Sequence, residues 1–198
     1  MAFVDPYFDE DIGDLRNLLG AKTSEELKEL EPQVVFANEL ELESVGVPRT
    51  NDFTELLLIH RQLFKDVYDW AGKIRVVDIK KNAEGAEYFL IVSKITDAAS
   101  YVFGELTKES HLRGLSIEEF VNRLAYFYDQ LNYIHPFREG NGRAQRVLWN
   151  RIAKDAGYEL DWTLVVGDEN DEASRQASEK MDVSGLVAMF TKVVRSSM

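Results

Sequence analysis

The feature that most constrains the fold is an apolar helical repeat that ends in a short polar run. Residues 116–119 (Ser-Ile-Glu-Glu) have the form of a capping box, and apolar residues then recur at three- and four-residue spacing as far as Ile134. Several flanking positions are apolar as well, which is typical of a central helix. The polar run 135–146 (His-Pro-Phe-Arg-Glu-Gly-Asn-Gly-Arg-Ala-Gln-Arg) follows and opens a second helical pattern near 142–157. The sequence therefore predicts a helix–loop–helix at the centre of the molecule.

The other helical patterns combine apolar spacing with capping residues or an acidic first turn. They predict helices over 24–31, 32–44, 52–71 and 93–108, from the acidic turn 168–172, and from Asp182 or Ser184 onward. Pro32 is tolerated at the first position of a helix, so it is expected to start the second of these. Gly72 is expected to end the third.

One segment has a β pattern instead. Residues 74–79 are β-branched and partly alternating, residues 80–85 are typical of a turn, and residues 88–90 suit a return strand. A lone hairpin is barely stable in water, so this one is expected to lean on the helices. The predicted fold class is mainly α, a helical bundle with a small β-hairpin.

Length and composition restrict the class of protein. A chain of 198 residues suits one domain, and the absence of cysteine excludes disulfides and thiolate metal sites. A net charge of −12 disfavours nucleic acid and anionic membranes as partners. We expect a cytoplasmic protein, because the N-terminal residues lack a signal-peptide pattern and no apolar run approaches the ~20 residues of a membrane span. Two basic groups nevertheless indicate local anion sites: Arg138, Arg143 and Arg146, and Arg75, Lys80 and Lys81.

The polar run has the residues of a phosphate cradle. Gly140, Asn141 and Gly142 lie at the start of a predicted helix, where glycines let backbone N–H groups approach a ligand closely. The unpaired N–H groups and the dipole of a helix N-terminus favour phosphate. Arg143 and Arg146 are three residues apart, so they share one face and can clamp phosphate oxygens.

Three further residues of the run complete a reactive site. Glu139 precedes the cradle and, beside a polyphosphate, is best explained as a Mg²⁺ ligand that shares the ion with phosphate oxygens. His135 is a candidate general base that could take a proton from an incoming hydroxyl. Phe137 is expected to point into the core and fix the loop. Together these residues describe attack of a hydroxyl on a phosphate of a bound nucleotide.

The same run resembles the Fic family motif, His-x-Phe-x-Asp/Glu-Gly-Asn-Gly-Arg-x-x-Arg, and matches every specified position. The resemblance extends over about 15–156 and implies a single Fic domain over 1–198. Residues 1–50 would be an N-terminal helical extension, 51–157 the Fic core and 158–198 C-terminal helices. The implied reaction is transfer of AMP from ATP to a Ser, Thr or Tyr hydroxyl of a protein, with release of pyrophosphate.

The resemblance also implies roles for individual residues. His135 would be the base, Glu139 the Mg²⁺ ligand and Gly140 to Gly142 the anion hole. Arg143 and Arg146 would hold the β- and γ-phosphates. The hairpin would be the flap that aligns the target's backbone by strand addition, with Lys80 and Asn82 contributing to the nucleotide site.

Family members also differ in how they are restrained. An inhibitory helix carries Ser/Thr-x-x-x-Glu-Gly/Asn, and its Glu pairs with the position of Arg146. The residue four positions before Glu169-Asn170 is Val165, and the residue four positions before Glu84-Gly85 is Lys80. Neither pair therefore has the required Ser or Thr. The chain thus resembles toxins restrained by a separate small antitoxin, although a degenerate inhibitor in the C-terminal helix stays open. Type II topoisomerase subunits, of DNA gyrase or topoisomerase IV, are the targets that the resemblance suggests.

Two other functions remain as alternatives. The site could transfer another nucleotide or phosphate-containing group, although the intact Gly-Asn-Gly-Arg stretch favours AMP. A non-catalytic nucleotide-binding regulator is the second, although binding alone needs no base. Other notable side chains have structural interpretations: His60, Trp70 and Trp149 as core, His111 as a loop residue, and Asn150 and Arg151 as helix surface or as a border of the adenine.

Overall fold

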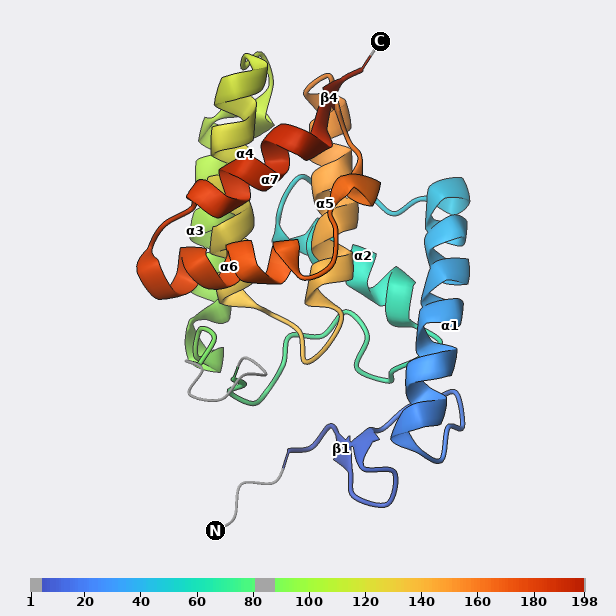
Figure 1. Cartoon of the computed structure of the whole chain (residues 1–198). Helices are drawn as coiled ribbons and strands as arrows, with labels where there is room; N and C mark the ends of the chain where they lie inside the picture. The colour runs from blue at the N-terminus through green and yellow to red at the C-terminus, as the bar shows by residue number, and fades with distance from the viewer. Residues whose placement is uncertain (1–4, 81–87, 198) are drawn as a thin grey trace.

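The computed structural model describes residues 5–80 and 88–197 and is mainly α-helical, which confirms the predicted fold class (Figure 1). The helices are α1 (Ser24–Val45), α2 (Phe53–Phe64), α3 (Ile95–Lys108), α4 (Ile117–Ile134), α5 (Asn141–Asp155), α6 (Glu169–Lys180) and α7 (Ser184–Val193). Short 3₁₀ turns are η1 (Val92–Lys94), η2 (Ser110–Leu112) and η3 (Trp162–Leu164). Two antiparallel pairs complete the described part: β1 (Phe8–Asp9) with β2 (Asp14–Leu15), and β3 (Tyr158–Leu160) with β4 (Val194–Ser196).

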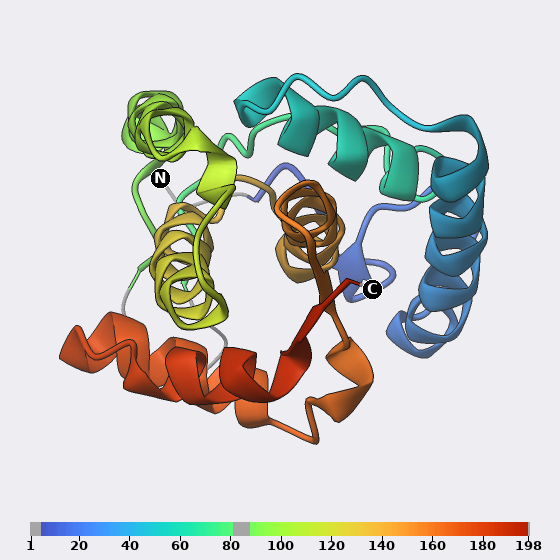
Figure 2. The same cartoon turned by 90° about the horizontal axis from the view of Figure 1, so that it is seen from above.

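The helices surround a central antiparallel pair, α4 and α5 (Figures 1 and 2). α3 packs on α4, α2 packs on α5, and α1 packs on the outer side of α2. α6 and α7 pack on each other and cover α4. The loop between α4 and α5 therefore lies at one end of the bundle, near the β1–β2 hairpin (Figure 1).

α4 begins and ends where the sequence predicts. The Ser116 Oγ accepts from the Glu119 N–H at 3.4 Å, and the Glu119 carboxylate accepts from the Ser116 N–H at 2.9 Å, so the capping box is complete. Phe120, Leu124 and the other apolar residues of the repeat are buried. The helix ends at Ile134, and its C-cap residue His135 has a left-handed backbone with φ 46°. α5 and α6 likewise match the predicted helices at 142–157 and after Gly167.

Two predicted helix boundaries are wrong. α1 is one continuous helix that passes through Pro32, where two helices were expected. Proline removes one N–H bond from a helix, and packing of the 22-residue helix along α2 outweighs that loss. α2 ends at Phe64, not at Ala71, because turns closed by the N–H groups of Val67 and Tyr68 on the Phe64 carbonyl follow it.

The predicted β-hairpin is reduced, among the described residues, to a single antiparallel bridge between Lys80 and Tyr88. Residues 74–79 form no strand, and two of their backbone groups bond to side chains: the Val77 carbonyl accepts from the Arg75 guanidinium at 2.7 Å and the Val76 N–H donates to the Tyr7 hydroxyl at 2.9 Å. The predicted turn residues Lys81 and Asn82 lie outside the described residues. The pairs β1–β2 and β3–β4 were not predicted. In the described part of the chain, no helix is long and apolar enough to cross a membrane.

Candidate active site

The loop between α4 and α5 is held from within by Asn141. Its Oδ1 accepts from the Phe137 N–H at 2.9 Å and its Nδ2 donates to the Phe137 carbonyl at 2.8 Å. Asn141 and Phe137 are both buried, and the Phe137 ring stacks on His60 at 3.7 Å. The Asn141 side chain thus acts inside the protein, where it holds the backbone of the loop. The placement of Phe137 in the core is confirmed.

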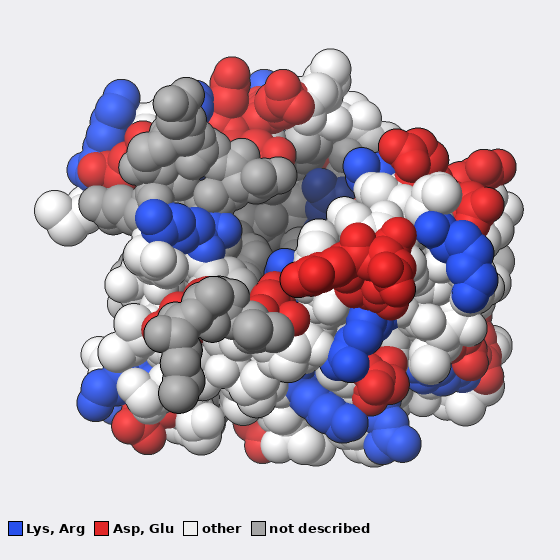
Figure 3. Space-filling view, turned by 90° about the horizontal axis from the view of Figure 1, so that it is seen from below, with Lys and Arg blue, Asp and Glu red and all other residues white. Residues whose placement is uncertain are grey.

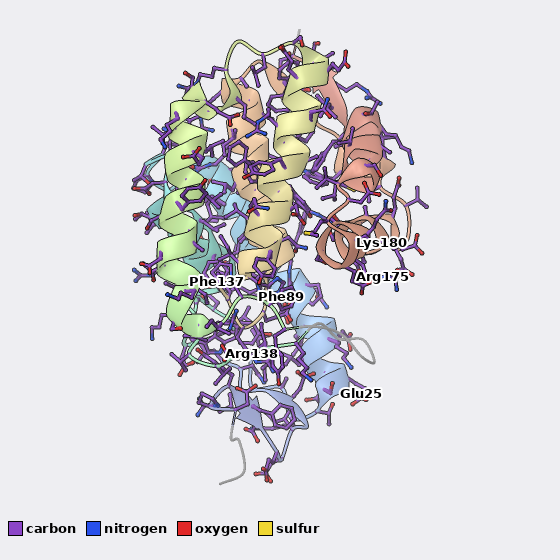
Figure 4. The ribbon with its side chains drawn as sticks, turned by 90° about the vertical axis from the view of Figure 1, so that its left-hand side faces the viewer. Glu25, Phe89, Phe137, Arg138, Arg175 and Lys180 are labelled. Atoms are coloured by element: carbon purple, nitrogen blue, oxygen red, sulfur yellow. The ribbon has the colours of Figure 1, made fainter. Side chains whose placement is uncertain are left out.

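Two contacts orient the imidazole ring of His135. Its Nδ1 lies 3.2 Å from the Asn132 carbonyl oxygen, an acceptor, so Nδ1 carries the proton and donates. Nε2 is then the basic nitrogen of the neutral ring. The ring also stacks on Phe89, with centroids 3.6 Å apart. Figure 4 shows Phe89 and Phe137 at the end of α4, where the loop begins.

Arg75, in the segment after α2, binds the start of the same loop. Its fully buried guanidinium donates to the carbonyls of His135 at 2.8 Å, Val77 at 2.7 Å and Leu90. Burial lowers its pKa, and the nearby Asp78 carboxylate opposes that shift. The sequence groups Arg75 with Lys80 and Lys81 as a second anion site, and for Arg75 this interpretation is wrong, because its guanidinium donates to backbone carbonyls.

His60 holds the backbone of Glu139. Its Nδ1 accepts from the Gly72 N–H at 2.8 Å, so Nε2 carries the proton and donates to the Glu139 carbonyl at 2.9 Å. Burial lowers the pKa of His60 to about 3, so the ring is neutral. The core position expected for His60 is confirmed, and Gly72, expected to end a helix, is instead its bonding partner.

The two glycines of the cradle differ in what surrounds them. Gly140 has φ 81°, and a Cβ there would lie 2.3 Å from the Phe64 ring, so no other residue fits. A Cβ on Gly142 would meet no atom of the described residues within 4 Å, apart from its neighbours in its own helix. The first glycine is therefore required by packing, whereas the second leaves open space at the N-terminus of α5, where N–H groups favour an anion.

Arg143 is held by acidic and aromatic groups. One guanidinium nitrogen, Nη2, lies 2.5 Å from the Glu31 carboxylate and 3.3 Å from that of Glu139, and the guanidinium covers the Phe64 ring at 4.7 Å. Glu31 comes from α1 and also accepts from the Tyr68 hydroxyl at 2.7 Å. Burial, together with the Glu31 charge, raises the pKa of Tyr68 and keeps that hydroxyl protonated. All the ion-pair contacts that Arg143 makes with the described residues use this one nitrogen.

Arg146 has a different environment. It forms no ion pair with any described residue, and its guanidinium carbon lies 5.2 Å from the Trp162 ring centroid. The Trp162 Nε1–H donates to the Asn150 Oδ1 at 2.7 Å. Asn150 therefore helps to hold the tryptophan that contacts Arg146. Arg151, in contrast, pairs with the buried Glu55 at 2.7 Å and is structural.

Glu139 suits a cation shared with a ligand. Its carboxylate is 46% exposed and accepts from the Gly140 N–H at 2.8 Å, within the cradle itself. The described residues contain no group of three or more His, Asp or Glu side chains that could hold a metal. A lone carboxylate at a phosphate site fits Mg²⁺, which keeps waters and takes phosphate oxygens as its other ligands.

The loop lies on the hollowed face of the molecule (Figure 3), where basic and acidic side chains surround the hollow. Arg138 is directed toward the N-terminal hairpin (Figure 4), and its Nε donates to Asp5 at 2.9 Å. Arg138 is thus separated from Arg143 and Arg146, which share α5. Lys80 lies over the Tyr88 ring at 4.6 Å.

Sequence reasoning missed three supporting residues: Glu31, Phe89 and Trp162. Glu31 was read as the end of a helix, and the other two lie outside the motif. Each acts through a contact between segments distant in sequence, and no spacing rule within one element detects such a contact.

The chain matches the model of the Fic/DOC family over residues 51–153. It is 40% identical over 171 residues to protein adenylyltransferase VbhT of Bartonella schoenbuchensis, an alignment that covers 86% of this chain and 35% of VbhT. A Fic protein of Salmonella typhimurium, named as a probable protein adenylyltransferase, is 34% identical over 96% of this chain and 92% of its own length. The chain thus spans about a third of VbhT and nearly all of the Salmonella protein.

A solved structure has the same fold. The N-terminal Fic domain of a VirB-translocated Bep effector protein from Bartonella quintana, solved with bound ADP, superposes with a TM-score of 0.88 at 26% identity. The superposition covers 96% of this chain and 95% of that domain.

Proposed function

The chain belongs to the Fic/DOC family, and we propose that it is a protein adenylyltransferase that transfers AMP from ATP to a Ser, Thr or Tyr hydroxyl of a target protein. The observation that carries the proposal is the His135 tautomer. Because Nδ1 donates to the Asn132 carbonyl, Nε2 is the basic nitrogen of the ring, and His135 lies in the loop that leads to the anion cradle. The two curated relatives compared above are named as adenylyltransferases, and the Bartonella quintana domain binds ADP.

The proposed chemistry follows from these positions. His135 Nε2 takes the proton of the target hydroxyl as its oxygen attacks the α-phosphorus of ATP. The bond from that phosphorus to the bridging oxygen breaks, and pyrophosphate leaves. The backbone of Gly140 to Gly142 binds phosphate oxygens, and Arg143 and Arg146 bind the β- and γ-phosphates. Glu139 would hold Mg²⁺, which would neutralise phosphate charge when bound.

The flap remains part of the proposal. Lys80 and Asn82 would border the nucleotide, and the extended backbone beside the Lys80–Tyr88 bridge would align a target segment by strand addition. Phe89 fastens this segment to the base through its ring stack on His135. Residues 51–157 would form the catalytic core.

We also propose a separate restraining partner. The chain lacks the Ser/Thr-x-x-x-Glu-Gly/Asn pattern, and Arg146 has no carboxylate partner among the described residues. A groove of about 520 Å³ between α1 and α5 runs past Val147 and Asn150. A small antitoxin helix that carries a glutamate would fit these features. A type II topoisomerase subunit is the proposed target class, and a cytoplasmic location without direct nucleic-acid or membrane contact goes with it.

ATP labelled separately on the α- and γ-phosphate tests the transferred group. Incubated with Mg²⁺ and bacterial lysate, the chain is expected to label a protein from α-labelled ATP only. Label from the γ-phosphate would instead support a kinase-type transfer. ATP binding without labelling from either position would favour a non-catalytic regulator.

A further inference from the structure

The structure assigns Trp162 a role as the positioning residue of Arg146, a role that rests on the proposed function of this arginine in binding the ATP polyphosphate. Trp162 lies in η3, outside the 51–153 match to the Fic/DOC family. The C-terminal segment thus supplies one side of the nucleotide site. No residue of the motif itself supports Arg146 in this way.

The first support is the contact between the two side chains. The Arg146 guanidinium carbon lies 5.2 Å from the Trp162 ring centroid, within the range of a cation–π interaction. Arg146 is exposed and forms no ion pair with a described residue, so the Trp162 indole is the group that supports its guanidinium. An aromatic face orients a guanidinium without neutralising its charge, so the full charge stays available for phosphate.

The second support is that the indole ring is itself fixed. Its Nε1–H donates to Asn150, one helical turn after Arg146 on α5. The Trp162 ring also packs edge-on with Phe190 of α7, with centroids 5.8 Å apart, and its centroid lies 6.3 Å from that of Tyr128 of α4. Trp162 is therefore held by three helices and presents a preset surface to the arginine.

The two arginines of α5 are consequently set in different ways. Arg143 lies within ion-pair distance of Glu31 and Glu139, whereas Arg146 lies against an indole and has only the longer-range charge of Glu39 near it among the described residues. A carboxylate competes with a phosphate for guanidinium donors, and an aromatic ring does not. Trp162 should therefore strengthen binding of ATP, which has β- and γ-phosphates, and leave AMP binding unchanged.

Calorimetric binding of ATP and AMP to the full chain tests this inference. Trp162→Leu removes the aromatic face, keeps an apolar side chain, and is expected to weaken ATP binding roughly 3- to 10-fold, with AMP binding unchanged. Trp162→Phe keeps a ring and is expected to restore most of the ATP affinity. Asn150→Ala frees the indole at an exposed position and should give a smaller loss, which keeps the test valid if Trp162→Leu unfolds.

A double-mutant cycle separates positioning from general stability. In an Arg146→Ala background, Trp162→Leu is expected to have no further effect on ATP binding. Tyr126→Leu is the matched control, because Tyr126 also lies under an arginine, Arg123, at 4.5 Å, but Arg123 pairs with Glu109 beyond α3. This control should leave ATP binding unchanged.

Several results would overturn the inference. These are equal losses for ATP and AMP, an undiminished loss in the Arg146→Ala background, tighter ATP binding by Trp162→Leu, or no ATP binding by the unaltered chain. The proposed function fails separately, if the chain binds ATP with the expected Trp162 effect and labels no protein.

Discussion

The Nε atom of Arg75 donates a hydrogen bond to the carbonyl oxygen of His135 at 2.8 Å. This bond joins the segment after α2 to the residue proposed as the base. The backbone of His135 is in the left-handed region, which is unfavourable for residues other than glycine. Contacts with the surrounding protein must therefore stabilise this conformation. The Arg75 side chain supplies that support, and the backbone N–H of Arg75 donates a further hydrogen bond to the Pro136 carbonyl at 2.8 Å.

Replacing Arg75 with lysine is expected to lower both stability and activity. An ammonium cannot satisfy the carbonyls of His135, Val77 and Leu90 together, so at least one buried acceptor loses its partner. The free energy of unfolding in urea should fall by about 2–4 kcal/mol. The exposed Arg113→Lys is the control and should change it by less than about 0.5 kcal/mol. Equal stability of the Arg75→Lys protein and the unaltered chain would contradict this role.

The two cradle glycines should respond oppositely to alanine. Gly140→Ala places a methyl group against the Phe64 ring at a residue with a left-handed backbone. The free energy of unfolding should therefore fall by about 2–4 kcal/mol. Gly142→Ala meets no atom of the described residues beyond its own helix and should leave thermal unfolding unchanged or slightly improved. Its methyl group would nevertheless occupy the ligand space, so ATP affinity should fall. Unimpaired ATP binding by Gly142→Ala would place the phosphates elsewhere.

His60 should make stability depend on pH. Its pKa is about 3 in the folded chain, against an ordinary value of 6.5, so the unfolded chain binds the extra proton. The contribution of neutral His60 is complete above pH 6.5 and is lost as the pH falls toward 3. Below pH 6.5 the unfolding free energy should fall by up to about 1.4 kcal/mol per pH unit from this group. The unfolding free energy of His60→Gln, measured in urea, should lack this part of the pH dependence. The same pH dependence in His60→Gln and the unaltered chain would show that the folded chain does not lower the pKa of His60.

Removal of Mg²⁺ should weaken ATP binding through Glu139. Without a cation its half-exposed carboxylate faces the phosphates, a repulsion of about 1–4 kcal/mol at 4 Å. A chelator should therefore weaken ATP binding by the unaltered chain far more than binding by Glu139→Gln. Calorimetry with and without the chelator measures both. A chelator effect that is the same in the two proteins would remove Glu139 from the metal site.

The sequence was most informative where local chemistry determines structure. Both ends of α4 were predicted, because the Ser116 capping box and the glycine-rich run are local signals. The motif also identified the residues that the loop brings together, from His135 to Arg146. It could not show that Asn141 binds the Phe137 backbone, since the same amide could equally have faced a ligand.

The errors arose where tertiary contacts outweighed local preference. Packing of α1 on α2 carries the helix through Pro32, and turns at Phe64 end α2 before its apolar pattern stops. Arg75 had the sequence appearance of an anion ligand, but only the fold shows three carbonyls around it. Glu31 and Trp162 support the arginines from segments on either side of the family match, and no local pattern predicts these pairings.

The central claim is that the His135 loop transfers AMP, and mass spectrometry of an isolated acceptor protein tests it most directly. The acceptor found with α-labelled ATP would be incubated with the unaltered chain or with His135→Ala, and ATP binding measured in parallel. The account predicts the mass of one AMP group on a hydroxyl residue, a rate roughly 10²–10⁴-fold lower for His135→Ala, and ATP binding preserved in both. An unchanged rate for His135→Ala, or an added group other than AMP, would contradict it.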